Sequence, residues 1–245
     1  VGKKLEDVKM VVSGAGAAAS ACTKLYLSLG LKKENLLMLD SQGVIRKDRE
    51  KLSEPKKIFA TDRTDAYTLA DALKGADVFL GVSKANVLTR EMIRSMADKP
   101  IVFACANPNP EITYEEAKAS RDDLILGTGR SDYPNQVNNV LAFPYIFRGA
   151  LDVRATTINE EMKHAAVYAI ARVAREEIPA EIQKQHNLEG LTFGPEYLIP
   201  IPWDPRLLPE VALAVAKAAV DSGVARKPIT DWDAYREKLI SMKRV

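Results

Sequence analysis

The chain has 245 residues, 47% hydrophobic and 28% charged, with a formal net charge of +2, and this composition excludes a disordered or collagen-like protein. We expect neither a nucleic-acid nor a membrane partner, because the chain has no long run of lysine and arginine and no stretch of about 18 apolar residues. Two cysteines, Cys22 and Cys105, are too few for a disulfide framework, and the chain opens without a signal-peptide pattern, so we expect a cytoplasmic protein.

Short apolar runs alternate with amphipathic stretches along the first half of the chain. We predict five strands, at residues 8–12, 35–39, 77–81, 100–104 and 124–127. We predict four helices between them, at residues 17–29, 68–73, 89–96 and 113–119. Strands that are apolar throughout and separated by helices are typical of a parallel sheet with both faces covered. The expected fold class is therefore α/β, a doubly wound, Rossmann-like parallel sheet.

The second half of the chain is predicted to be helical. Apolar residues at helical spacing predict helices at residues 140–147, 159–177, about 209–221 and 231–242. Five prolines between Phe193 and Pro209 argue against regular structure in that segment. We expect residues 1–178 to form the Rossmann core. Residues 179–245 are then a C-terminal helical extension that packs on the same core and is not an independent domain.

A glycine-rich turn follows the first predicted strand and opens the first predicted helix. Residues 14–19, Gly-Ala-Gly-Ala-Ala-Ala, fit the pattern G-x-G-x-x-G/A. In that pattern Gly14 allows the tight turn, Gly16 lets the backbone approach a pyrophosphate, and Ala19 lets the helix pack on the strand. Free amides at the helix N-terminus favour an anion. The expected contacts of this turn with a dinucleotide are Gly14 and Gly16.

Asp40 ends the second predicted strand, about 20 residues beyond the glycine turn, where a carboxylate that binds ribose is expected. A hydrogen bond to a free 2′-hydroxyl would favour NAD, because a 2′-phosphate would be repelled. Arg46, Lys47, Arg49 and Arg63 follow in the loops and would offset that repulsion. The choice between NAD and NADP therefore stays open.

Amide side chains follow two of the later strands, at the edge where ligands of such sheets bind. Asn107 follows the fourth strand and suits either the nicotinamide ribose or a substrate carboxylate, with a turn residue before Pro108 as an equal alternative. Gln136, Asn138 and Asn139 stand just before an apolar helix. One of the two asparagines is expected to cap that helix, but three amides exceed what a cap requires.

Neither histidine, His164 or His186, follows a predicted strand, so a core or surface role is expected for both. No cluster of histidine, cysteine or carboxylate residues has the spacing of a metal site.

Several longer segments resemble the NAD(P)-binding domain of bacterial malic enzymes. The segments that carry the resemblance are residues 13–18, Asn107-Pro108, 129–139 (GRSDYPNQVNN), 143–152 (FPYIFRGALD) and 193–200 (FGPEYLIP). The resemblance covers nearly the whole chain, and the GRSDYPNQVNN segment is far more specific than the glycine turn.

The resemblance implies oxidative decarboxylation of L-malate to pyruvate and CO2 with reduction of NAD or NADP, assisted by Mg2+ or Mn2+. It implies that Asn107 and Asn138 contact malate, with Asn139 beside them, and that Ser83 and Asn107 approach the cofactor. The other cofactor contacts that it implies are Gly14, Gly16, Ala17, Ala18 and Asp40.

The resemblance also implies that the catalytic tyrosine and lysine and the acidic metal ligands lie on an N-terminal malic domain. Only residues 1–7 precede the first predicted strand, so we assign no catalytic and no metal-binding residue to this chain. We expect that domain as a partner, a homo-oligomer, and no turnover by this chain alone. Two alternatives remain open: another NAD(P)-dependent dehydrogenase domain, and a non-catalytic module that senses a dinucleotide.

Overall fold

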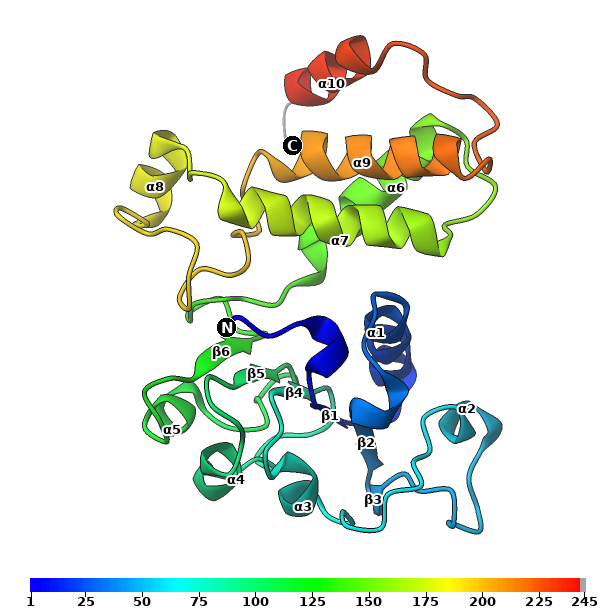
Figure 1. Ribbon diagram of the computed structural model, residues 1–245. Coiled ribbons are helices and arrows are strands. Elements are labelled where there is room, and N and C mark those ends of the chain that lie inside the picture. Colours follow the sequence, from blue (N-terminus) through cyan, green and yellow to red (C-terminus); the bar gives the residue numbers. More distant parts are fainter. Residues whose placement is uncertain (243–245) are drawn as a thin grey trace. The chain divides into compact units, whose positions relative to one another are not determined.

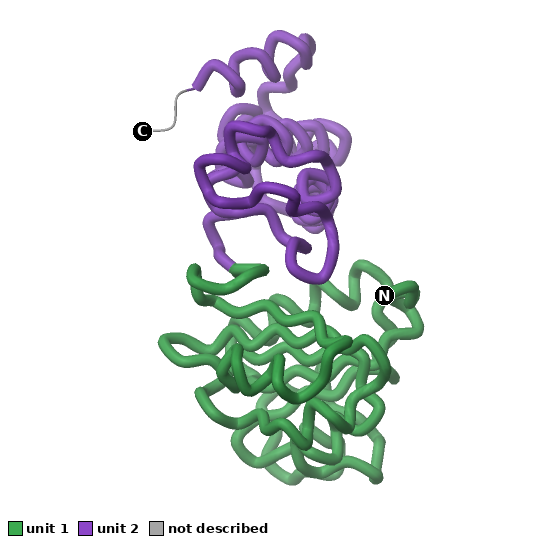
Figure 2. The backbone as a smooth tube through the Cα atoms, turned by 90° about the vertical axis from the view of Figure 1, so that its left-hand side faces the viewer, with its two compact units in different colours: residues 1–137 green, residues 138–245 purple. Residues whose placement is uncertain are grey.

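The computed structural model describes residues 1–242, which form two compact units (Figure 2). The first unit is Val1–Val137 and the second begins at Asn138. This boundary between the compact units lies earlier in the chain than residues 178 and 179, where the sequence-based division was expected. Whether residues 179–245 belong to the same folding unit as the sheet stays a prediction.

A six-stranded sheet with the order β3-β2-β1-β4-β5-β6 forms the centre of the first unit (Figure 1). Its strands are β1 (Met10–Ser13), β2 (Leu36–Asp40), β3 (Gly43–Val44), β4 (Val78–Gly81), β5 (Ile101–Ala104) and β6 (Ile125–Thr128). All neighbours are parallel except β3, which pairs antiparallel with β2. The Rossmann-like α/β fold class is thereby confirmed. The two-residue β3 was not predicted, because so short a strand carries no periodic pattern.

Five helices connect the strands, and threonine side chains begin three of them. The helices are α1 (Ala17–Ser28), α2 (Glu54–Lys57), α3 (Leu69–Leu73), α4 (Arg90–Arg94) and α5 (Tyr114–Lys118). Thr68, Thr89 and Thr113 each accept a hydrogen bond from an amide in the first turn of α3, α4 and α5. The sequence predicted four of the five helices. It missed α2, a single turn that begins Glu54-Pro55.

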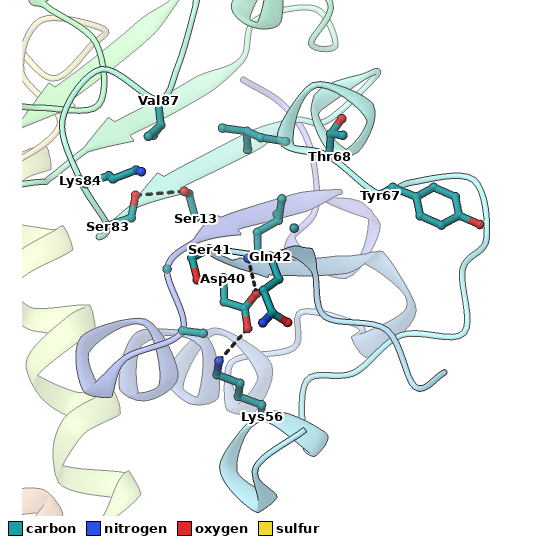
Figure 3. Close-up of a pocket in the computed structure, with 15 residues that line it drawn as sticks. Ser13, Asp40, Ser41, Gln42, Lys56, Tyr67, Thr68, Ser83, Lys84 and Val87 are labelled. Atoms are coloured by element: carbon teal, nitrogen blue, oxygen red, sulfur yellow. Dashed lines mark hydrogen bonds and ion pairs between the residues drawn. The ribbon is translucent and has the colours of Figure 1, made fainter. Parts of the chain in front are cut away.

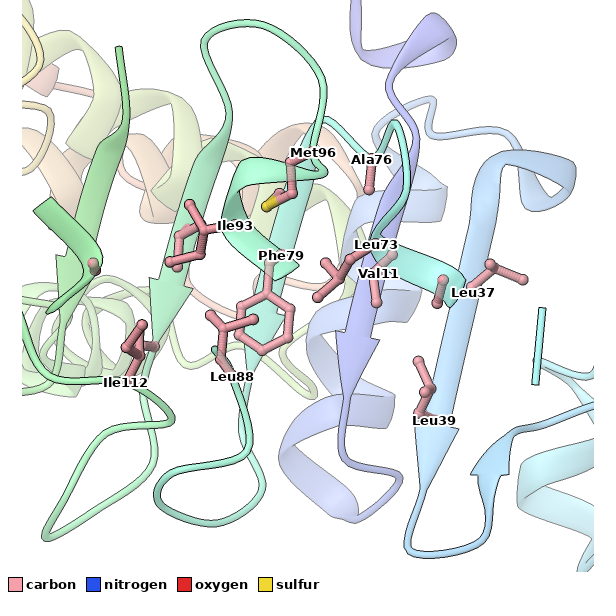
Figure 4. Packing of buried hydrophobic residues seen from close by; sticks show 14 of the residues in the cluster. Val11, Leu37, Leu39, Leu73, Ala76, Phe79, Leu88, Ile93, Met96 and Ile112 are labelled. Carbon is pink, nitrogen blue, oxygen red and sulfur yellow. The ribbon is translucent and has the colours of Figure 1, made fainter. Parts of the chain in front are cut away.

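Alternate residues of each strand pack into two separate cores, one on each face of the sheet. Val11, Leu37 and Phe79 pack with residues of α3, α4 and α5 on one face (Figure 4). On the other face, Met10 and Val12 pack with Ala19 of α1. Because both faces are buried, the strands are apolar at nearly every position, which is the pattern that predicted a parallel sheet.

The second unit is helical. After the 3-10 turn η3 (Asn139–Leu141), its helices are α6 (Phe143–Asp152), α7 (Glu160–Arg175), α8 (Ala180–His186), α9 (Leu207–Asp221) and α10 (Trp232–Ser241). Helices α6 and α7 both pack on α9 around one apolar core. The proline-rich segment is irregular up to Leu207, where α9 begins and takes in Pro209 near its N-terminus.

Gly149 of α6 sets how closely that helix approaches α9, and its replacement by alanine tests this packing. A Cβ at Gly149 would lie 2.4 Å from the carbonyl oxygen of Ala212 and 2.9 Å from Cβ of Val215. We expect Gly149→Ala to lower the free energy of unfolding by about 1–3 kcal/mol, the usual cost of overpacking. Urea denaturation measures the change. Gly194→Ala is the matched control, because a Cβ there meets only one atom, at 3.8 Å; equal stability of the two variants would contradict the close approach.

Candidate functional site

The carboxyl ends of β1, β2 and β4 surround a pocket of about 680 Å3 (Figure 3). Ser13 and Gly14 line it from the end of β1, Asp40 from the end of β2, and Ser83 from the loop after β4. Lys56 of α2 completes the rim beside Asp40. The pocket lies at the point where the strand order turns from β2 on one side of β1 to β4 on the other, which is where open α/β sheets bind ligands.

The glycine turn after β1 is fixed by its neighbours on both sides. Gly14 has a φ of +121°, and its amide donates a hydrogen bond of 2.9 Å to the carbonyl oxygen of Leu39 in β2. A Cβ at Gly14 would lie 2.7 Å from the carbonyl oxygen of Val82, after β4. Both the backbone angle and the space therefore demand glycine at this position.

Gly16 and the first residues of α1 leave room for a ligand. A Cβ at Gly16 would meet no protein atom within 4 Å, and Gly16 contributes no side-chain cap to α1. Ala17 and Ala18, both exposed, carry the first amides of a helix that has no acidic residue in its first turn. Such amides lack partners within the helix and attract an anion. Ala19 is buried against β1, as the sequence pattern predicts.

Asp40 is held between two cations. Its side chain is only 8% exposed, and Arg49 donates to its two oxygens from Nη1 and Nη2, at 3.0 Å each. Lys56 Nζ lies 2.6 Å from Oδ2, and the Gln42 amide donates to Oδ1 at 3.0 Å. Burial raises the pKa of Asp40, but the hydrogen bonds from Arg49, Lys56 and Gln42 lower it to about 2. The cluster thus combines two positive charges with one negative charge.

Of the four loop cations that the sequence singled out, Arg49 alone contacts Asp40. Arg46 pairs with Asp48, Lys47 with Asp62, and Arg63 with Asp65. Lys56 was missed, because it belongs to the short helix α2 and nothing in its sequence neighbourhood points toward β2.

Ser83 and Asn107 follow β4 and β5. The hydroxyl oxygens of Ser83 and Ser13 lie 3.0 Å apart, which links the ends of β4 and β1 (Figure 3). The backbone amide of Ser83 donates a hydrogen bond to the buried carboxyl group of Glu111. The sequence did not predict a role for Glu111. Asn107 is exposed in the loop after β5.

Asn138 and Asn139 open the second unit. Asn138 accepts a hydrogen bond of 3.1 Å from the Val140 amide and so caps η3, the capping role expected for one of the two asparagines. Asn139 is exposed. The structure thus brings the glycine turn, Asp40 and Ser83 to one edge of the first unit, while these two amides belong to the other unit. Contact of any of these residues with a ligand stays a prediction.

Comparison with known families and structures identifies the chain. The family model for the NAD-binding domain of malic enzymes matches residues 1–185. The chain belongs to the malic enzyme family. The chain is 60% identical over 98% of its length to an NADP-dependent malic enzyme of Haemophilus influenzae and 54% identical over 97% to an NAD-dependent malic enzyme of Rhizobium meliloti. The crystal structure of the Entamoeba histolytica malic enzyme is similar to 97% of this chain, with a TM-score of 0.85 and 35% identity, over 48% of its own length.

The chain spans about a third of the length of those two curated relatives, 32% and 31% respectively. The described residues contain no group of three or more histidine, cysteine, aspartate or glutamate side chains that could hold a metal ion. Within residues 1–242, every helix is too short or too polar to cross a membrane.

The ion pairs of Asp40 predict how its contribution to stability changes with pH. The pKa of Asp40 is about 2 in the folded chain and about 3.9 in an unfolded one. A lowered folded pKa stabilises the fold above the unfolded value, and this stabilisation is lost as pH falls toward the folded value. We expect Asp40→Asn to be less stable than wild type at pH 7, with the difference shrinking as pH falls below about 4. Urea denaturation at several pH values measures it; a difference that is independent of pH would contradict the ion pairs.

Proposed function

We propose that this chain is the cofactor-binding part of a malic enzyme, which converts L-malate to pyruvate and CO2 while reducing NAD(P)+. The observation that carries the proposal is the pocket at the ends of β1, β2 and β4. It joins a glycine turn with open helix amides to a carboxylate held between two cations. The family match includes the GRSDYPNQVNN segment and so argues against a different dehydrogenase on the same scaffold.

The pocket residues fit the parts of a dinucleotide. The space beside Gly16 and the amides of Ala17 and Ala18 suit the pyrophosphate, and Gly14 holds the turn that presents them. Asp40 and its cations suit the adenosine ribose. A dinucleotide held by these residues would supply a nicotinamide ring as the hydride acceptor.

The substrate end of the site is assigned by resemblance. In this proposal Ser83 approaches the nicotinamide half, Asn107 contacts both cofactor and malate, and Asn138 contacts malate with Asn139 beside it. Neutral amides suit malate because the amide NH2 group donates to a carboxylate and the amide oxygen accepts from the hydroxyl group.

The charge around Asp40 favours NADP. A lone carboxylate would repel a 2′-phosphate, but Arg49 and Lys56 outnumber Asp40 and leave one excess positive charge. Of these two cations Lys56 lines the pocket, and its side chain is 33% exposed, so a 2′-phosphate would find this ammonium group in place. The names of the relatives support this choice only in part, because a protein 54% identical to this chain is NAD-dependent.

The rest of the catalytic apparatus is proposed to lie outside these residues. The Haemophilus influenzae and Rhizobium meliloti relatives are about three times as long as this chain, which supports a further malic domain with the tyrosine, the lysine and the ligands of Mg2+ or Mn2+. A homo-oligomer and a cytoplasmic location are part of the same proposal. The two free cysteines support that location.

Titration calorimetry of the full chain with NADP+ and NAD+ tests the proposal. We expect binding of at least NADP+, and at least tenfold weaker binding by Gly14→Ala, because its Cβ would lie 2.7 Å from the Val82 carbonyl oxygen. Gly30→Ala is the matched control. Gly30 also has a positive φ, +117°, but an added Cβ there meets nothing within 4 Å. The complete gene product should oxidise malate with Mn2+. The proposal would be contradicted if wild type bound neither NADP+ nor NAD+, or if this chain alone formed pyruvate.

Lys56→Gln tests the choice of cofactor. We expect it to weaken NADP+ binding about tenfold, the loss of one charge-assisted hydrogen bond, and to change NAD+ binding much less. Lys57→Gln is the matched control, because Lys57 is the next residue of α2 but pairs with Glu54 instead. An equal loss of affinity for NADP+ and NAD+ in Lys56→Gln would show that Lys56 does not bind the 2′-phosphate.

A further inference from the structure

We propose that Glu111 is a positioning residue for the nicotinamide half of the cofactor site. Its buried carboxyl group fixes the loops that follow β4 and β5. The inference rests on the proposed function for the identity of the ligand, and on the hydrogen bonds of Glu111 for the role of the residue.

Glu111 accepts hydrogen bonds from backbone amides just beyond the point where the main-chain hydrogen bonds between β4 and β5 end. The last of these bonds runs from the Cys105 amide to the carbonyl oxygen of Gly81, at 2.9 Å. Beyond it, the Ser83 amide donates to Oε1 of Glu111 and the Ala106 amide donates to Oε2, both at 3.0 Å. One carboxyl group therefore holds one amide from each loop. Without it, the Ser83 and Ala106 amides would both lose the acceptor that ties the two loops together.

The Glu111 side chain is enclosed by protein, and the backbone of Glu111 is held by a hydrogen bond. Glu111 is fully buried, and its carbonyl oxygen accepts a hydrogen bond of 3.0 Å from the Leu88 amide. The next residue, Ile112, packs in the apolar core beneath the sheet. Removing a carboxyl group from water is unfavourable unless hydrogen bonds replace the water. An apolar side chain would fill this space without that cost, so the carboxyl group is better explained by the two amides that it positions.

Gly81 shows how closely the carboxyl group is fitted. A Cβ at Gly81 would lie 2.3 Å from the Cδ atom of Glu111 and 2.5 Å from Oε1. The residue at the end of β4 therefore has to be glycine for the carboxyl group to reach both amides.

The network extends from Glu111 to the glycine turn. The Ser83 hydroxyl lies 3.4 Å from Oε1 of Glu111 and 3.0 Å from the hydroxyl of Ser13. Because the carboxylate accepts, Ser83 donates to Glu111 and Ser13 donates to Ser83. The ends of β1, β4 and β5 are thus tied together on the side of β1 away from β2. In a doubly wound fold this side serves the second mononucleotide half, whereas the acid after β2 serves the adenosine half.

Glu111→Gln in the full chain separates the two halves. The glutamine amide nitrogen would face one of the two backbone donors, so one loop loses its anchor. We expect NADPH to bind about tenfold more weakly, with a smaller enhancement of the fluorescence of its reduced nicotinamide ring. Adenosine 2′,5′-bisphosphate, the adenosine half alone, should bind within about twofold of wild type. Calorimetry and fluorescence titration provide the measurements.

Three further variants exclude a merely structural effect. Ile112→Val removes a buried methylene next to Glu111 without touching its acceptors, and Glu34→Gln makes the same chemical change at an exposed residue. Both should bind NADPH as wild type does. Gly81→Ala displaces the carboxyl group without removing it, and should give the same split between NADPH and the adenosine half as Glu111→Gln. If Glu111→Gln does not fold, Gly81→Ala decides the question.

Unchanged NADPH affinity and fluorescence in folded Glu111→Gln would overturn the proposal, as would an equal loss of NADPH and adenosine 2′,5′-bisphosphate. Wild type that binds neither NADPH nor NADP+ would instead contradict the proposed function. The two failures are therefore distinguishable.

Discussion

At Gly14 the chain leaves β1 between two neighbouring strands, and the geometry of the pocket depends on this crowded exit. The Gly14 amide is bonded to Leu39 on one side, while the Val82 carbonyl oxygen leaves no room for a Cβ on the other. The chain must therefore turn at once, with a φ of +121°, and α1 begins three residues later. The open amides of α1 are consequently directed by β2 and β4 together, and a change in either strand end would move them.

Two carboxyl groups at the carboxyl edge of the sheet, those of Asp40 and Glu111, have partners of different charge. Around Asp40 the carboxylate is neutralised by Arg49 and Lys56, and one positive charge remains. On the other side of β1, the Glu111 carboxyl group is bonded to backbone amides and a hydroxyl. A carboxylate with charged partners is suited to recognise charge, whereas one with amide partners is suited to fix backbone. The same functional group thus serves two purposes, set by its partners.

The sequence predicted the sheet well because its signals are local. Both faces of the sheet are buried, so each strand is an apolar run. The glycine turn and Asp40 were found because their spacing is fixed by one strand-helix-strand unit. Lys56 was not found, since its contact with Asp40 depends on how a loop of irregular backbone folds back. The packing of α7 on α9 was not predicted either, because a contact between helices far apart in the sequence leaves no local signal.

The role of Glu111 could not be predicted from the sequence either, because it depends on residues that are distant in the chain. In sequence it is an ordinary glutamate after Pro110, and Gly81 is an ordinary glycine at the end of a strand. The meaning of each depends on the other, because the carboxyl group occupies the space that a Cβ at Gly81 would take. Ser83 and Ala106 depend on the same group for their acceptors. The last residue of β4 and three residues in the two following loops therefore constrain one another, and the constraint acts at the edge of the sheet where polar contacts replace the main-chain ladder. The Glu111 carboxyl group is fully buried at this edge and therefore has to be satisfied by hydrogen bonds, since a buried polar group without partners costs about 1–3 kcal/mol.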